Sequence, residues 1–223
     1  MRRSPRAGLV LVVLPVAAAC FLLAVVPGSG PWAEGSRHGR WLVVWNGYGE
    51  VRGDDGTVVL SPRVAASGSR THAALVVTER QYGDLALSLR VRTEHQLRSG
   101  RPNAWEVGWV LWHYTDPRRF YALALKPTGW ELSKQDERYP GGQRFLTSGD
   151  GPEFPVGTWH DIGVVQVGNT VKVSGNGRLL AEFTDTEHPY LSGSVGLYTE
   201  DARVGFADVT ADDVRTNSEE SVS

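Results

Sequence analysis

The sequence has a single cysteine, Cys20, and it lies inside an apolar run near the N-terminus. The rest of the chain therefore has no disulfide or thiol chemistry, and its fold must be stabilised by an apolar core. About 180 residues are enough, because a domain near 150 residues buries roughly two-thirds of its unfolded surface. A Cys/His cluster, an EF-hand loop, a Gly-rich phosphate loop and a Gly-x-Ser-x-Gly elbow are also missing, which argues against the sites that these motifs build.

An excess of basic charge is lacking too. Residues 1–36 hold three of the 23 Lys and Arg residues and one of the 25 Asp and Glu residues, which leaves 20 basic and 24 acidic residues in the remainder. This weak acidity, without a basic stripe, argues against nucleic acid or an anionic lipid surface as a partner.

The N-terminal segment has the layout of an export signal. Arg2, Arg3 and Arg6 precede an apolar run from Ala7 to Val26, and a Gly/Pro/Ser-rich break follows. Such a segment can be cleaved as a signal peptide, but about 20 apolar residues can also remain as a membrane anchor. We therefore expect the domain to be secreted or anchored to the outer face of the cytoplasmic membrane, with residues 1–36 as signal or anchor and linker.

Helical periodicity is absent from the remainder, which instead alternates with a period of two. In the run 84–92, Leu85, Leu87, Leu89 and Val91 share one face, as in a strand packed on a core. Similar runs occur at 41–45, 57–60, 73–78, 104–113, 119–125, 130–133, 143–147, 159–167, 170–174, 178–184, 194–199 and 203–209.

Turn residues separate these runs. Seven prolines, from Pro102 to Pro189, fall in the gaps, and Asn176-Gly177 supplies the positive φ angles of a two-residue hairpin turn. Many short strands without intervening helices predict an all-β fold, an antiparallel β-sandwich of the jelly-roll type. We expect one such domain over residues 37–211, followed by a polar tail at 212–223.

Motifs in the C-terminal half resemble a known family. They are Gly157-Thr158-Trp159-His160-Asp161-Ile162, Val171 to Leu180 around Asn176-Gly177, Gly193-Ser194-Val195-Gly196-Leu197-Tyr198 and Val204-Gly205-Phe206-Ala207-Asp208-Val209. This succession resembles concanavalin A-like lectin and glucanase jelly rolls, above all the bacterial family-16-like glycoside hydrolase or 3-keto-disaccharide hydrolase group. The resemblance implies that Trp159 and Phe206 anchor the core. Asn103 to Trp109 departs from the Asn-Ser-Gly pattern of the disaccharide-hydrolase branch, so the activity is not carried over.

The segment 104–134 is the most unusual part of the chain. It holds four of the eight tryptophans, Trp105, Trp109, Trp112 and Trp130, together with several charged side chains. Sugars present apolar ring faces and hydroxyl edges, so their binding sites combine flat aromatics with polar groups. The predicted substrate-binding residues are Arg90, Glu106, Trp109, Trp112, His113, Tyr121, Lys126, Trp130, Glu131 and Lys134.

Packing is the alternative role for these aromatics. Alternation over 104–113 places Trp105, Trp109 and His113 on one face and Glu106 and Trp112 on the other. One of the two faces must be sandwich core, so at least two tryptophans are expected to be packing residues. Glu106 lies on a very apolar strand, where a carboxylate needs a partner or a ligand.

Catalysis is left open by the sequence. Retaining hydrolysis needs two carboxylates about 5–5.5 Å apart, but the Glu-x-Asp-x-x-Glu run of family-16 glucanases is missing. Glu106, Glu131 and His113 are the catalytic candidates. A polysaccharide lyase is a further option, because Arg90, Arg92, His113, Tyr121 and Lys126 have the required chemistry.

No cofactor is required by this interpretation, although jelly-roll lectins often hold a structural Ca²⁺. Glu50 and Asp208, or Glu200-Asp201, could supply its ligands, while carboxylates in turns more commonly cap backbone amides. We expect a monomer whose partner is a glycan or polysaccharide. Three functions remain: a non-catalytic carbohydrate-binding domain, a carbohydrate-active enzyme, and a cell-surface interaction domain.

Overall fold

The computed structural model describes residues 30–67 and 70–214. The apolar run 7–26, Cys20 and residues 215–223 lie outside the described residues, so the predicted signal or anchor and most of the polar tail do too. Among the described residues, no helix has the length and apolar character that crossing a bilayer requires.

The described residues form fifteen strands and one short 3-10 turn, η1 (Pro140–Gly142). The strands are β1 (Arg37–His38), β2 (Trp41–Trp45), β3 (Glu50–Asp54), β4 (Thr57–Ser61), β5 (Ala73–Tyr82), β6 (Leu85–Gln96), β7 (Gly108–Asp116), β8 (Arg119–Lys126), β9 (Gly129–Asp136), β10 (Gln143–Gly149), β11 (His160–Val167), β12 (Thr170–Gly175), β13 (Arg178–Thr184), β14 (Gly193–Glu200) and β15 (Ala202–Asp213).

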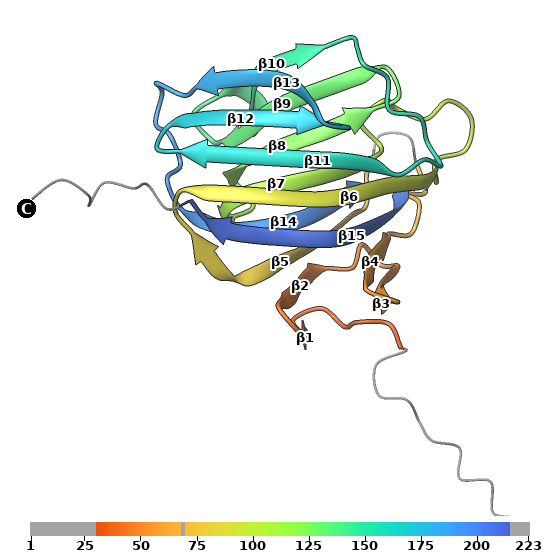
Figure 1. Ribbon diagram of the computed structural model, residues 1–223. Helices are drawn as coiled ribbons and strands as arrows, with labels where there is room; N and C mark the ends of the chain where they lie inside the picture. The colour runs from red at the N-terminus through yellow and green to blue at the C-terminus, as the bar shows by residue number, and fades with distance from the viewer. Residues whose placement is uncertain (1–29, 68–69, 215–223) are drawn as a thin grey trace, which may run out of the picture.

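Two antiparallel sheets stack face to face (Figure 1). The eight-stranded sheet has the order β1-β2-β5-β14-β7-β8-β9-β10, and the seven-stranded sheet has the order β13-β12-β11-β6-β15-β4-β3. This arrangement confirms the predicted all-β jelly-roll sandwich. All thirteen predicted runs contain a strand, whereas β1 and β3 were not predicted.

The core lies between the sheets and follows the period-two pattern. In β6, Leu85, Leu87, Leu89 and Val91 are all buried in it, as predicted. Phe206 is fully buried there, as the family resemblance implied. Trp32 also belongs to this cluster, and its backbone N–H donates to the carbonyl of Val51. The folded domain therefore takes in residues that the sequence assigned to the linker.

Two local features depend on glycine. Asn176 and Gly177, with φ of 50° and 74°, connect β12 to β13 and confirm the predicted hairpin turn. At the start of β7, a Cβ on Gly108 would lie 2.5 Å from Cγ2 of Val91 and 2.7 Å from Cγ1 of Val204. Only glycine lets the two sheets approach this closely where β7 begins.

Two sequence predictions about individual side chains are wrong. Trp159 does not lie in the core: it covers Gly205 on the outer face of the seven-stranded sheet, with the guanidinium groups of Arg90 and Arg92 at 5.2 Å and 4.8 Å from its ring. His113 does not share the face of Trp109. It has a φ of 50° at a bulge in β7, which turns its ring inward against Tyr121.

Candidate functional site

A pocket of about 270 Å³ opens on the outer face of the eight-stranded sheet. We call it the Trp105 pocket; it is lined by Trp105, Trp109, Glu131, Gln143, Phe145 and Glu200. Four strands contribute, namely β7, β9, β10 and β14, and Trp105 stands in the loop before β7. Because β14, β7, β8, β9 and β10 are consecutive in the sheet, residues far apart in sequence meet here.

Two aromatic rings of the pocket face solvent. Trp105 is 46% exposed and Phe145 is 64% exposed, which is unusual for side chains of this size. Trp109 forms the floor, where its indole N–H donates to the carbonyl of Trp105 at 2.8 Å. Its ring meets that of Tyr198 edge-on, with centroids 5.7 Å apart. The pocket therefore offers flat apolar surfaces on a fixed base.

Two carboxyl groups line the same pocket. Oε2 of Glu131 accepts a hydrogen bond from Nζ of Lys126 at 3.1 Å, and both side chains are largely buried. Oε1 of Glu200 accepts one from the hydroxyl of Tyr198. Burial raises the pKa of Glu200 above its usual value, and the nearby carboxylates of Asp201 and Glu106 act in the same direction. The arrangement combines an ion-paired carboxylate with a carboxyl group whose pKa lies above its usual value.

Glu106 follows Trp105 in the loop before β7 and has no exposed surface. Its Oε1 accepts hydrogen bonds from Nε of Arg98 at 2.5 Å and from Nδ2 of Asn103 at 2.8 Å, while Oε2 has no hydrogen-bond partner among residues 30–67 and 70–214. Nη2 of Arg98 also donates to the buried carboxylate of Asp201 at 2.5 Å. The carboxylate therefore has the partner that the sequence called for, and this network fixes the loop that carries Trp105.

Three of the ten predicted binding residues lie at this face. Trp109 and Glu131 line the pocket, and Lys126 is bound to Glu131. Arg90 lies on the other sheet, where it pairs with Asp208. The remaining six are buried and do not belong to the lining of this pocket: Glu106, Trp112, His113, Tyr121, Trp130 and Lys134.

The buried residues have structural partners of their own. Nε1 of Trp112 donates to Oε1 of Gln166 at 2.7 Å, and that of Trp130 donates to the carbonyl of Gly151 at 3.1 Å. Nδ1 of His113 lies 2.7 Å from the carbonyl of Tyr190. The expectation that at least two tryptophans are packing residues is thus confirmed. His113 and Tyr121, two of the residues considered for lyase chemistry, are both buried and bonded to neighbouring groups.

Lys134 and Tyr121 belong to a second buried network. Nζ of Lys134 donates to Oδ2 of Asp185 at 2.7 Å and to the carbonyl of Glu187 at 2.5 Å. The hydroxyl of Tyr121 donates to the same carboxylate at 2.6 Å. This network fixes the β13–β14 loop to the end of the sandwich.

Sequence reasoning did not place Gln143, Phe145 and Glu200 in a site. Phe145 follows a basic residue in a short polar strand, and Glu200 was considered only as a metal ligand. The available signal was the aromatic residue of β10 beside a strand that carries Glu131. This signal is useful only when the strand order is known, because the pairing of Phe145 with Ser133 of β9 cannot be seen in the sequence.

The candidate calcium ligands point to arginines instead. Asp208 pairs with Arg90 at 2.7 Å, and Glu50 lies 3.8 Å from Arg52. Within residues 30–67 and 70–214, no three His, Cys, Asp or Glu side chains group so that they could hold a metal ion. Calcium binding stays a prediction from the sequence.

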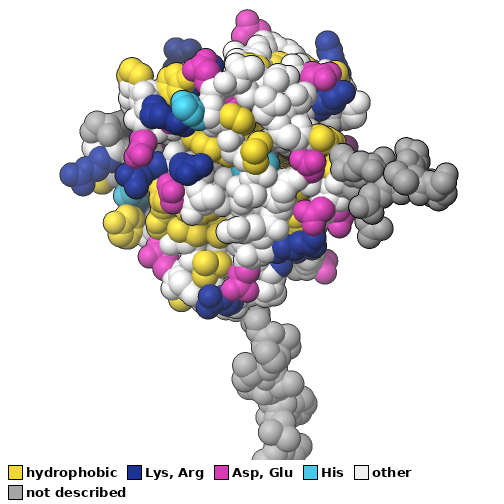
Figure 2. Space-filling model, turned by 90° about the vertical axis from the view of Figure 1, so that its left-hand side faces the viewer, with side chains coloured by type: hydrophobic (Ala, Val, Ile, Leu, Met, Phe, Trp, Pro, Cys, Tyr) yellow, Lys and Arg dark blue, Asp and Glu magenta, His cyan; other side chains and the backbone are white. Residues whose placement is uncertain are grey.

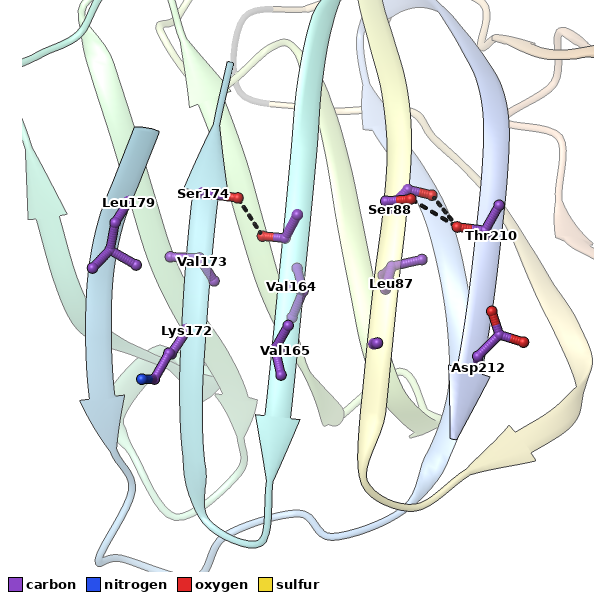
Figure 3. Close-up of a pocket in the computed structure, with 12 residues that line it drawn as sticks. Leu87, Ser88, Val164, Val165, Lys172, Val173, Ser174, Leu179, Thr210 and Asp212 are labelled. Carbon is purple, nitrogen blue, oxygen red and sulfur yellow. Dashed lines mark hydrogen bonds between the residues drawn. The ribbon is translucent and has the colours of Figure 1, made fainter. Parts of the chain in front are cut away.

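A second hollow lies on the outer face of the seven-stranded sheet (Figure 3). Small residues form part of its floor, and its hydroxyl groups are hydrogen-bonded to neighbouring groups of the protein. The hydroxyl oxygens of Ser88 and Thr210 are 2.7 Å apart, and the hydroxyl of Ser174 donates to the carbonyl of Gly163. Aromatic side chains are missing from its lining. It therefore fits a sugar less well than the Trp105 pocket does.

Charged side chains of both signs are interspersed over the end of the sandwich that Figure 2 shows. Ion pairs of the domain include Arg118 with Glu137, Arg138 with Asp136, and Arg144 with Glu187. This pattern agrees with the weak net charge and gives no basic stripe on that face.

Comparison with solved structures shows the same fold. The carbohydrate-binding module CBM66 from Bacillus subtilis is 15% identical, with a TM-score of 0.56, and the match covers 78% of this chain and 95% of that one. A galectin-like protein of unknown function from Bacillus subtilis is 15% identical, with a TM-score of 0.54 and coverages of 77% and 88%. A putative glycosyl hydrolase from Parabacteroides distasonis is 14% identical, with a TM-score of 0.51 and coverages of 79% and 89%.

No curated protein matches this sequence significantly. A family match, in contrast, spans residues 32–211. It begins at Trp32, which belongs to the sandwich core, and ends within β15, so it covers all fifteen strands except the last two residues of β15. By this match, which confirms the resemblance seen in the sequence, the chain belongs to the family of 3-keto-alpha-glucoside-1,2-lyase-like domains.

Proposed function

We propose that this domain binds a carbohydrate in the Trp105 pocket. The observation that carries the proposal is the exposure of Trp105 and Phe145 beside two carboxyl groups and an amide. Aromatic rings can stack on the apolar face of a sugar, while Glu131, Glu200 and Gln143 can exchange hydrogen bonds with its hydroxyls. The names of the family and of two similar structures, a carbohydrate-binding module and a putative glycosyl hydrolase, support the same ligand class.

Trp105→Ala is expected to weaken binding about tenfold, because it removes a stacking surface. A glycan array that includes α-glucosides identifies the ligand, and calorimetry then measures its affinity for the parent and the variant. Tyr48→Ala is the matched control, since Tyr48 is an exposed aromatic residue in the β2–β3 turn, outside the lining of the pocket. If the Trp105→Ala variant and the parent bind the glycan with equal affinity, the carbohydrate site does not lie in the Trp105 pocket.

Catalysis of an elimination is the second candidate, and the raised pKa of Glu200 favours it. A 1,2-lyase acting on a 3-keto-glucoside takes the proton from C2, which the ketone acidifies. The electrons of that bond form the C1=C2 double bond as the C1–O bond breaks, and the leaving oxygen receives a proton. In the pocket, the Glu131 carboxylate would act as the base and Glu200 would supply the proton.

Glu200→Gln and Glu131→Gln should each slow this elimination about 10²–10⁴-fold, the usual contribution of a general acid or base. The absorbance of the unsaturated ketone formed from methyl 3-keto-α-glucoside gives the rate. The raised pKa of Glu200 also predicts that the parent loses activity as the pH rises through that pKa, since the acid form is lost. Unchanged rates in both variants would leave binding as the function.

The location of the domain is a separate proposal. Residues 2–26, a basic start followed by an apolar run, support export of the domain in a secreted or membrane-anchored form. Fractionation of cells that express the whole chain tests this, and recovery of the domain in the cytoplasm would exclude it.

A further inference from the structure

A row of side chains leads away from the Trp105 pocket across the outer face of the eight-stranded sheet. The strand register pairs each member with the next, from β9 through β8, β7, β14 and β5 to β2. We call it the outer row, and its members in this order are Glu131, Ala124, Trp109, Tyr198, Leu75 and Trp45.

Packing shows that the row lies on one face. Leu75, Trp109 and Ala124 form an apolar cluster separate from the core, and Tyr198 and Trp45 pack against it. Their neighbours along the strands, such as Val110, belong to the core between the sheets. Neighbouring strands are about 4.8 Å apart, so the row spans roughly 24 Å from end to end.

The polarity of this face changes along the row. At the β9 end, Glu131 has Lys126 beside it and shares the Trp105 pocket with Gln143. At the β2 end, Leu42, Val44 and Trp45 are apolar, partly exposed, and packed on the cluster that contains Leu75. One end can satisfy the hydroxyls of a sugar, and the other offers apolar surface that water contacts.

We propose that the ligand of the Trp105 pocket is an amphiphilic glycoside, whose sugar occupies the pocket and whose apolar aglycone lies along Tyr198 and Trp45, which are partly exposed and pack on the cluster that contains the buried Leu75. The inference rests on the proposed function and adds the substrate class. An aglycone fits this stretch better than further sugar units do, because the partly exposed Leu42, Val44 and Trp45 carry no carboxylate or amide to bind hydroxyls. An apolar aglycone that covers partly exposed apolar side chains also removes them from water, which favours binding.

The test compares two glucosides with the same sugar. Methyl α-D-glucopyranoside and octyl α-D-glucopyranoside, the latter below its critical micelle concentration, are titrated into the full chain by calorimetry. The octyl glucoside is expected to bind about tenfold more tightly, since its chain buries apolar surface along the outer row. If methyl glucoside binds and octyl glucoside binds no better, this inference is overturned while carbohydrate binding stands. If neither binds, both proposals fail for glucosides.

Variants locate the aglycone. Trp45→Ala should remove most of the octyl advantage and leave the affinity for methyl glucoside unchanged, whereas Tyr48→Ala, an exposed aromatic residue of the adjacent turn, should change neither. Val44→Thr, which keeps the shape of a partly exposed side chain and adds a hydroxyl, gives a milder loss if Trp45→Ala does not fold. An octyl advantage that survives both variants would contradict the placement.

Maltotriose distinguishes a sugar chain from an aglycone. It extends the same α-glucoside by polar units, so we expect it to bind no more tightly than methyl glucoside. If maltotriose instead gains as much as octyl glucoside, and Trp45→Ala abolishes that gain, the row would be a platform for an oligosaccharide and the aglycone inference would be wrong.

Discussion

A Lys134→Met variant is expected to lose about 3–5 kcal/mol of its free energy of unfolding, because one partner of a buried ion pair is removed. The side chains of Lys134 and Asp185 are 0% and 1% exposed. Without the ammonium group, the Asp185 carboxylate stays buried with the Tyr121 hydroxyl as its remaining side-chain hydrogen-bond donor and with the Arg144 guanidinium 3.6 Å away. The carbonyls of Glu187 and His188 lose a donor as well.

The pH dependence of this loss has a definite sign. Burial alone would raise the pKa of Asp185, but hydrogen bonds from Lys134 and Tyr121 outweigh it and lower that pKa. The Arg138 guanidinium lowers the pKa of neighbouring Asp136 to about 2. Both carboxyls bind fewer protons when folded, so their stabilisation is full above their unfolded pKa values and is lost as the pH falls through the folded ones. The gap between the variant and the parent should therefore narrow in acid.

Urea denaturation followed by tryptophan fluorescence measures the effect. Lys172→Met is the matched control, because Lys172 pairs with Glu182 at 3.3 Å on an exposed part of the sheet. Exposed pairs contribute about 0–1 kcal/mol. Equal stabilities of the two variants would show that the buried network contributes no more than a surface pair.

The alternation of apolar and polar residues in the sequence predicted most strands but did not predict the bulges. β6 was predicted because four apolar residues alternate with more polar ones along it. β3 has only Val51 as a buried residue, so its sequence shows no such alternation. The backbone of His113 has a positive φ, which turns its side chain to the face opposite to the one that alternation along β7 predicts. The alternation of apolar and polar residues in the sequence cannot reveal such a change. A bulge depends on the pairing partner, which is β14 here and lies about eighty residues later in the chain.

The site was predicted in part for the same reason. Trp109 and Glu131 lie on adjacent stretches of sequence rich in aromatic and charged residues, and this local signal is genuine. Glu200 joins them only through the β14–β7 pairing. The partner of Glu106 is Arg98, which sits in an irregular loop whose conformation no periodic pattern describes. Long-range pairing and loop geometry are therefore what sequence reasoning lacked.

Arg98→Met should be at least as damaging as Lys134→Met, since two fully buried carboxylates lose one guanidinium. Glu106 and Asp201 both have 0% exposed side chains, and Oε2 of Glu106 already lacks a hydrogen-bond partner within the described part of the chain. Removing one partner of a buried ion pair costs about 3–5 kcal/mol. Asp201 also accepts backbone N–H groups of Ala65 and His72, so the loop around these residues should loosen with it.

The control for this variant is Arg118→Met, which breaks an exposed pair with Glu137 at 3.0 Å and should cost about 0–1 kcal/mol. A second readout separates the network from general instability. Arg98 lowers the pKa of Glu200, so removing it should raise that pKa further and move the alkaline loss of elimination activity to higher pH at a temperature where the variant is folded. Arg98→Lys keeps the charge and should shift the profile less, although one ammonium cannot span both carboxylates as the forked guanidinium does. A stable Arg98→Met variant with an unmoved profile would mean that the loop carrying Trp105 is fixed by other contacts, and that Arg98 has no part in positioning the pocket.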